Sequence, residues 1–111
     1  MIDWQRIREL VDEFGADDFA EVVDLFLQEV EGAIDQLAES CGDPSLMAQH
    51  MHFLKGAALN LGFSELSDLC SQGESAAKAG SSDPAMVETV RRKFAESRVV
   101  FQRELPTRCA A

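Results

Sequence analysis

The sequence predicts an all-α fold: an antiparallel up-down four-helix bundle with an additional short N-terminal helix. Three observations lead to this fold class. Apolar residues recur at intervals of three and four, the period of an amphipathic helix, and nowhere alternate for long with polar residues. Glycine and proline separate the helical segments. The connections are only about two to four residues long, and connections this short force consecutive helices to run antiparallel.

The first two predicted helices span about 3–14 and 17–40. The first ends at Gly15. Its apolar side chains lie on one side of the helix and are Ile7, Leu10, Val11 and Phe14. The second carries a longer apolar stripe, made of Phe19, Val23, Phe26, Val30, Ile34 and Leu37. The short first helix is therefore expected to cap one end of the bundle.

The third predicted helix runs from about 44 to 61. Gly42, Asp43 and Pro44 break the helical pattern before it, and a proline is compatible with the first turn of a helix. Gly62 follows its last turn, and glycine is the residue that best tolerates the left-handed conformation at a helix end.

The last two helices are predicted from their N-terminal residues. Ser64 is expected to be the N-cap of a fourth helix that runs to Gly80. Asp83 followed by Pro84 is a typical start for a fifth helix, which should end near residue 104. Residues 106–111 are expected to be a frayed tail.

Composition narrows the classes of function. A chain of 111 residues has room for one domain, so 1–111 is predicted to be a single unit. The net charge of −10 disfavours nucleic-acid and membrane partners. No apolar run reaches the ~20 residues of a membrane span, and no secretory signal is visible. The three cysteines are scattered, which argues against disulfides and a zinc site and favours a cytoplasmic location.

The third helix carries an exposed histidine. With Leu54 at the centre of the buried face, a rotation of about 100° per residue places His52 roughly 160° away, toward water. Four residues fall on the Leu54 side: Met47, Met51, Ala58 and Leu61. His50 falls on the core side and points about 200° from His52, so the two histidines cannot bind one metal ion.

The exposed face around His52 has two unusual features. Gly56 lies four residues after the histidine, inside a helix, where glycine costs about 1 kcal/mol relative to alanine. A bare backbone there suggests close approach by another molecule. Between Pro44 and Ser64 there is no Asp or Glu, and the one charge is Lys55. We expect this absence of carboxylates to favour an added phosphate group, which carries a charge of about −1.5 to −2.

The segment from His52 to Phe63 reads HFLKGAALNLGF. It resembles the motif of histidine phosphotransfer (HPt) domains, in which His-x-Leu-Lys-Gly is followed six residues after its glycine by a second glycine. The resemblance extends over residues 20–105. It includes residues of the preceding and following helices, namely Phe26, Leu27, Leu37, Leu66, Cys70, Glu74, Ala77 and Gly80. Many members of the family carry alanine where this chain has Met51, and we expect only a packing difference there.

The resemblance implies a function. His52 would accept a phosphoryl group and exchange it with the aspartate of a response-regulator receiver domain. Lys55 would assist the phosphoryl group and Gly56 would leave it space, while Gly62 would shape the helix end. The chain would be a phosphoryl carrier, not an enzyme, and would bind no cofactor or metal. Mg²⁺ is expected on the receiver domain, and the other implied partner is an upstream, often hybrid, histidine kinase. We expect a monomer.

A partner would dock beside the histidine. The expected docking residues are Ser45, Ala48, Gln49, Leu59 and Phe63. Two other classes of protein remain as alternatives. One is a helical adaptor that has lost the phosphotransfer chemistry, which would bind a receiver domain without becoming phosphorylated. The other is the dimerisation helix pair of a sensor kinase, but there an acidic residue normally follows the histidine, where this chain has Phe53.

Overall fold

The computed structural model describes residues 1–108, with side chains for residues 1–105. These residues form five helices and no strand, so the predicted all-α class is confirmed for them. The helices are α1 (Trp4–Phe14), α2 (Ala16–Glu39), α3 (Pro44–Leu61), α4 (Ser64–Lys78) and α5 (Pro84–Arg108).

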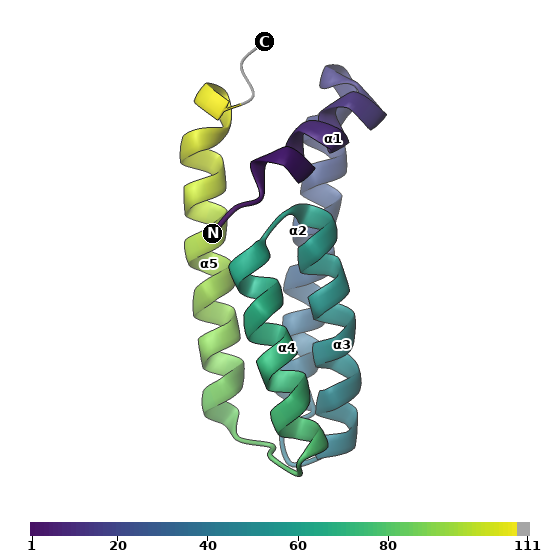
Figure 1. Cartoon of the computed structure of the whole chain (residues 1–111). Coiled ribbons are helices and arrows are strands. Elements are labelled where there is room, and N and C mark those ends of the chain that lie inside the picture. The colour runs from purple at the N-terminus through teal and green to yellow at the C-terminus, as the bar shows by residue number, and fades with distance from the viewer. Residues whose placement is uncertain (109–111) are drawn as a thin grey trace.

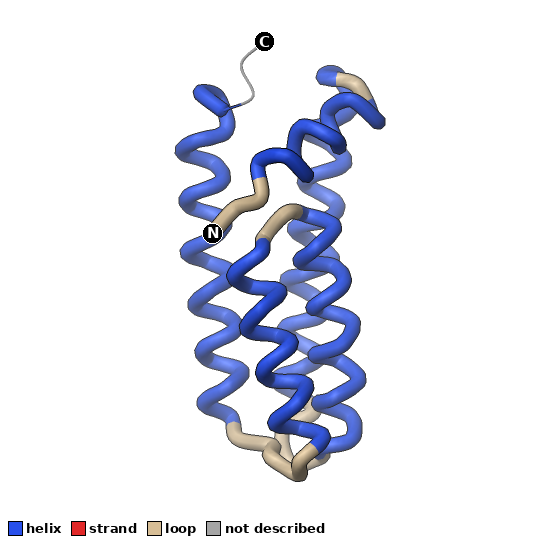
Figure 2. Tube along the Cα trace, in the orientation of Figure 1, coloured by secondary structure: helices blue, strands red, loops and turns tan. Residues whose placement is uncertain are grey.

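The four long helices α2 to α5 lie side by side (Figure 1). The α2–α3 and α4–α5 loops lie together at one end of the molecule, whereas the turn between α3 and α4 lies short of the other end, beneath α1 (Figure 2). The Cα positions extend over 47 × 19 × 17 Å. The axes of packed helices lie about 8–10 Å apart, so each short dimension accommodates two helices side by side. α1 lies obliquely across one end of the bundle, close to the turn between α3 and α4 (Figure 1).

Most helix ends agree with the sequence prediction. The side chain of Asp43 accepts a hydrogen bond from the backbone N–H of Leu46 at 3.1 Å, and Pro44 occupies the first turn of α3. Asp83 accepts from the N–H of Ala85 at 2.9 Å at the start of α5. Gly62 has φ 80°, the left-handed conformation predicted for it.

Ser64 is not an N-cap. The carbonyl of Phe63 already accepts the N–H of Ser67 at 3.0 Å, so Phe63 is the capping residue and Ser64 lies in the first turn. The hydroxyl of Ser64 instead donates to the carbonyl of Met1 at 3.1 Å. At its other end, α4 stops at Lys78, two residues before the predicted Gly80.

The last helix is longer than predicted. α5 continues to Arg108, beyond the end expected near residue 104. A proline this close to a helix end removes a single backbone hydrogen bond, so residue 106 need not end the helix at once. Residues 109–111, the rest of the predicted tail, lie outside the described residues.

The N-terminal segment is bonded to the end of α3. The N–H of Asp3 donates to the carbonyl of Gly62 at 2.7 Å, and the Arg6 Nε–H donates to the carbonyl of Asn60 at 3.0 Å. The ring of Trp4 stacks on that of Phe101, with ring centroids 6.0 Å apart. These contacts tie the N-terminal segment and α1 to the C-terminal end of α3 and to α5.

α3 packs more extensively against α4 than against any other helix. A Cβ atom at Gly73 would lie 2.7 Å from Cε of Met51, so any larger residue there would force the end of the Met51 side chain to shift. Further along, the hydroxyl of Ser67 donates to the carbonyl of Lys55 at 3.2 Å. The offset between α3 and α4 is therefore fixed at two points.

Two helical glycines should respond oppositely to alanine. Gly56 is exposed and a Cβ there meets no atom within 4 Å, so Gly56→Ala should stabilise the protein by about 0.4–1 kcal/mol. Gly73→Ala forces the fully buried Met51 to move and should be less stable than Gly56→Ala by about 1 kcal/mol or more. Urea unfolding of both variants measures the difference, and equal gains would contradict the close α3–α4 packing.

Candidate functional site

α3 presents His52 to solvent, as the helical period predicts. The side chain of His52 is 69% exposed, while Leu54 and Met51 are fully buried. The other residues assigned to the buried face are also in the core, namely Met47, Ala58 and Leu61. His50 is half-buried at the edge of the core.

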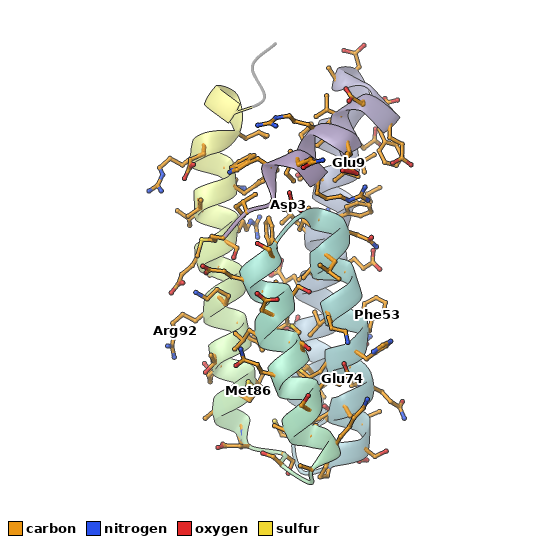
Figure 3. The ribbon with its side chains drawn as sticks, in the orientation of Figure 1. Asp3, Glu9, Phe53, Glu74, Met86 and Arg92 are labelled. Atoms are coloured by element: carbon orange, nitrogen blue, oxygen red, sulfur yellow. The ribbon has the colours of Figure 1, made fainter. Side chains whose placement is uncertain are left out.

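A carboxylate from α4 lies beside the imidazole. Oε2 of Glu74 is 3.1 Å from Nδ1 of His52. Its Oε1 accepts a hydrogen bond from Nζ of Lys55 at 2.8 Å, and Oε2 also lies 3.2 Å from Nζ of Lys78. Figure 3 shows Glu74 on the side of α4 that faces α3. These four residues, His52, Lys55, Glu74 and Lys78, are called the Glu74 cluster below.

Glu74 is ionised at neutral pH. Its side chain is only 9% exposed, but its hydrogen bonds to Lys55 and then to Lys78 outweigh the effect of burial and lower its pKa to about 2. An ionised carboxylate can only accept hydrogen bonds. The Nδ1 atom of His52 therefore carries the proton and its N–H donates a hydrogen bond to Glu74. This leaves the lone pair on Nε2, on the opposite side of the ring.

Glu74 is the functional residue that the sequence analysis missed. The expectation that no carboxylate lies near the histidine is wrong. It was based on the residues of α3 alone, and the carboxylate comes from α4. The repulsion that a lone carboxylate would exert on a phosphate group is offset here by the two ammonium groups of Lys55 and Lys78. Glu74 lies within the segment that resembles HPt domains, but its spacing from His52 in the sequence indicates no contact.

The other two site residues expected from the motif, Lys55 and Gly56, differ in exposure. The side chain of Lys55 is 30% exposed, because it bends toward Glu74. Gly56 is exposed, and the space beside its Cα is open. The bare patch of backbone that the sequence predicts beside His52 is present.

The predicted docking residues divide into two groups. Ser45, Gln49 and Leu59 are exposed on α3, and the Leu59 side chain is 56% exposed. Phe63 is fully buried and Ala48 nearly so, which leaves them little or no surface to offer a partner, contrary to the expected docking role.

The burial of Phe63 follows from the end of α3. The N–H of Phe63 donates to the carbonyl of Ala58 at 2.8 Å, which is the bond that closes a helix ending in a left-handed glycine. Such an end turns the next apolar residue back onto the helix. The ring of Phe63 accordingly packs between those of Phe94 and Phe101.

Phe53 is an exposed aromatic residue that the docking prediction left out. Its side chain is 49% exposed, and it lies on the outer side of α3 in Figure 3. It follows His52 directly in the chain, so with Leu59 it places apolar surface on the same helix as the histidine.

No helix among residues 1–108 is both long and apolar enough to cross a membrane. In the same part of the chain, His, Cys, Asp and Glu side chains nowhere gather in threes in a way that could hold a metal ion.

Comparison with known proteins identifies the family. The model of the Hpt domain matches residues 21–106. Among solved structures, the crystal structure of histidine-containing phosphotransfer protein B (HptB) from Pseudomonas aeruginosa PAO1 is similar, with 27% sequence identity and a TM-score of 0.82. The alignment covers 93% of this chain and 92% of that one. A search of proteins with curated functions gives no match. Because the family model spans well over half of the sequence, this chain belongs to the Hpt family of histidine phosphotransfer domains.

Proposed function

We propose that this chain is a phosphorelay carrier that accepts a phosphoryl group on Nε2 of His52 and exchanges it with the aspartate of a response-regulator receiver domain. The observation that carries the proposal is the 3.1 Å contact between Nδ1 of His52 and the ionised Glu74, since it leaves a free lone pair on an exposed nitrogen. The name of the similar protein HptB supports the same class of function.

The transfer needs no proton movement at His52. The Nε2 lone pair attacks the phosphorus of the aspartyl phosphate, the P–O bond to the aspartate breaks, and the aspartate carboxylate leaves. The imidazole becomes positively charged, and its Nδ1 proton stays in the hydrogen bond to Glu74. In the reverse direction a neutral imidazole leaves, with its proton already on Nδ1. The carboxylate of Glu74 thus stabilises the charged intermediate that both directions share.

Lys55 supplies positive charge beside the transferring group. Its ammonium is 2.8 Å from Glu74 and lies one turn from His52 on the same helix. The remaining requirements fall to the partner, whose receiver domain would hold the acceptor aspartate and Mg²⁺. We place the chain in the cytoplasm as a monomeric, single-domain carrier on an antiparallel up-down bundle, loaded by an upstream histidine kinase and without a catalytic cycle of its own.

The receiver would dock on the exposed side of α3. Leu59 and Phe53 provide apolar area there, and Ser45 and Gln49 provide polar contacts at its edge. Apolar residues of this kind contribute most of the affinity of an interface, whereas polar residues at its rim contribute less. Gly56 would let the backbone of α3 come close to the phosphoryl group and the receiver.

The assignment of His52 is tested by labelling. Incubation with phosphorylated receiver domains and Mg²⁺ should place the label on His52 alone, and His52→Gln should abolish it. The variant should unfold at nearly the wild-type temperature, since a surface substitution rarely costs more than ~0.5 kcal/mol. His50→Gln is the matched control and should still label. Label on the His52→Gln variant would contradict the assignment, and receiver binding by the wild type without label would indicate an adaptor.

The role of Gly56 is tested by adding a side chain. Gly56→Gln should fold, because a Cβ there meets no atom within 4 Å, but its side chain would occupy the space beside His52. We expect transfer from a receiver to slow at least tenfold, on the order of the cost of misplacing reacting groups by about 1 Å.

Gly32 provides the control for this substitution. It is also an exposed helical glycine with open space around its Cα, but it lies on α2, whereas the Glu74 cluster belongs to α3 and α4. Gly32→Gln should transfer at the wild-type rate. Equal rates for the two glutamine variants would refute close approach at Gly56.

A further inference from the structure

Lys78 is the one member of the Glu74 cluster to which the proposed function gives no role. It lies in the last turn of α4, four residues after Glu74. Its Nζ atom is 3.2 Å from Oε2 of Glu74, the same oxygen that accepts the hydrogen bond from His52. The ammonium and the imidazole therefore lie on either side of a single carboxylate oxygen.

Lys78 is freer to move than Lys55. Its side chain is 67% exposed, against 30% for Lys55, and its contact with Glu74 is the longer of the two. The Lys78 ammonium is surrounded largely by water, which screens its attraction to Glu74 and can hydrate it when it moves away. If Lys78 left, Glu74 would still accept hydrogen bonds from Lys55 and His52, so the buried carboxylate would stay paired. The departure of Lys78 is therefore inexpensive.

A phosphoryl group on Nε2 would attract this ammonium. It brings close to two negative charges and three acceptor oxygens to a site where Glu74 already carries one negative charge. The two lysines and the imidazolium supply three positive charges. The net charge of the phosphorylated cluster is close to zero only when both lysines contribute their positive charges. Lys78 can do so by changing partners, because a lysine ammonium is carried on a flexible four-carbon stem.

We propose that Lys78 is a second phosphoryl-binding residue, which leaves Glu74 and pairs with the oxygens of the phosphoryl group once His52 is phosphorylated. The inference rests on the proposed function. Glu74 then acts as a holding site that keeps the ammonium beside His52 until the phosphoryl group arrives. Lys78 lies on α4, 26 residues from His52 in the sequence and outside the His-x-Leu-Lys-Gly motif.

A narrower role for Lys78 would explain the same contacts. A cation in the last turn of a helix is favourable there, and Lys78 would then only balance the charge of Glu74. The two roles differ in what Lys78 contacts after phosphorylation. Two measurements distinguish these roles. One is the rate of labelling by a small phosphoryl donor, which needs no docking surface. The other is the same rate in a variant in which Glu74 has lost its charge.

The experiment uses the full chain and phosphoramidate as the donor. Nε2 of His52 attacks its phosphorus, the P–N bond of the donor breaks, and ammonia leaves. Lys78→Gln should slow labelling of His52 about three- to tenfold, in line with the loss of one charge-assisted contact. Lys78→Arg should stay within about twofold of wild type, because it keeps the charge. Arg92→Gln, on an exposed part of α5 that points away from the cluster in Figure 3, should have no effect.

Two further readouts decide between the roles. In ³¹P NMR, the second ionisation of the phosphohistidine should occur at higher pH in Lys78→Gln than in wild type, because the ammonium favours the doubly charged phosphoryl group. In a Glu74→Gln background, Lys78→Gln should still slow labelling. Loss of the effect in that background would overturn the inference, since Lys78 would then act only through Glu74.

The failures of the two proposals look different. If all Lys78 variants label at the wild-type rate with unchanged ³¹P titrations, the inference on Lys78 is wrong and His52 remains the phosphorylated residue. If the wild-type chain takes no label on His52 from phosphoramidate or from any receiver, the proposed function is wrong and the inference falls with it.

Discussion

The carboxylate of Glu74 joins the two helices that build the site. It accepts hydrogen bonds from Nδ1–H of His52 and from the ammonium of Lys55, both on α3, and it forms an ion pair with Lys78 on its own helix. Without it, the two ammonium groups would repel one another and the imidazole could carry its proton on either nitrogen. The orientation of the histidine, its tautomer and the position of both cations therefore depend on this one side chain, and on the pKa of about 2 that keeps it ionised.

The bundle is built so that Glu74 reaches α3. Gly73, its neighbour in the chain, leaves room for the end of the Met51 side chain between α3 and α4. The hydrogen bond from the Ser67 hydroxyl to the carbonyl of Lys55 joins α4 to α3 at a second point and fixes their offset. Asp3 and Arg6 hold the far end of α3 through the carbonyls of Gly62 and Asn60. Packing inside the bundle thus determines which side chains lie within hydrogen-bonding distance of the imidazole at the surface.

Features that depend on a single helix were predictable from the sequence. The exposure of His52 and Gly56 and the burial of Met51 follow from the period of α3, and the N-cap at Asp43 follows from local chemistry. The contact of Glu74 with His52 was not predictable from the sequence. A contact between two helices depends on their relative rotation and offset, and the spacing of residues along the chain does not give these. The burial of Phe63 was missed for another reason: Gly62 predicts a left-handed helix end, and such an end turns the following apolar residue inward.

The central claim is that Glu74 keeps the proton on Nδ1 and leaves Nε2 to react. Long-range ¹H–¹⁵N NMR of the His52 ring at neutral pH, before and after phosphorylation, tests it most directly. The account predicts the Nδ1–H tautomer in the free protein and ³¹P–¹⁵N coupling to Nε2 in the phosphorylated one, with a mixture of tautomers in Glu74→Ala. A proton mainly on Nε2 of the free wild-type protein, or phosphorus coupled to Nδ1, would contradict it.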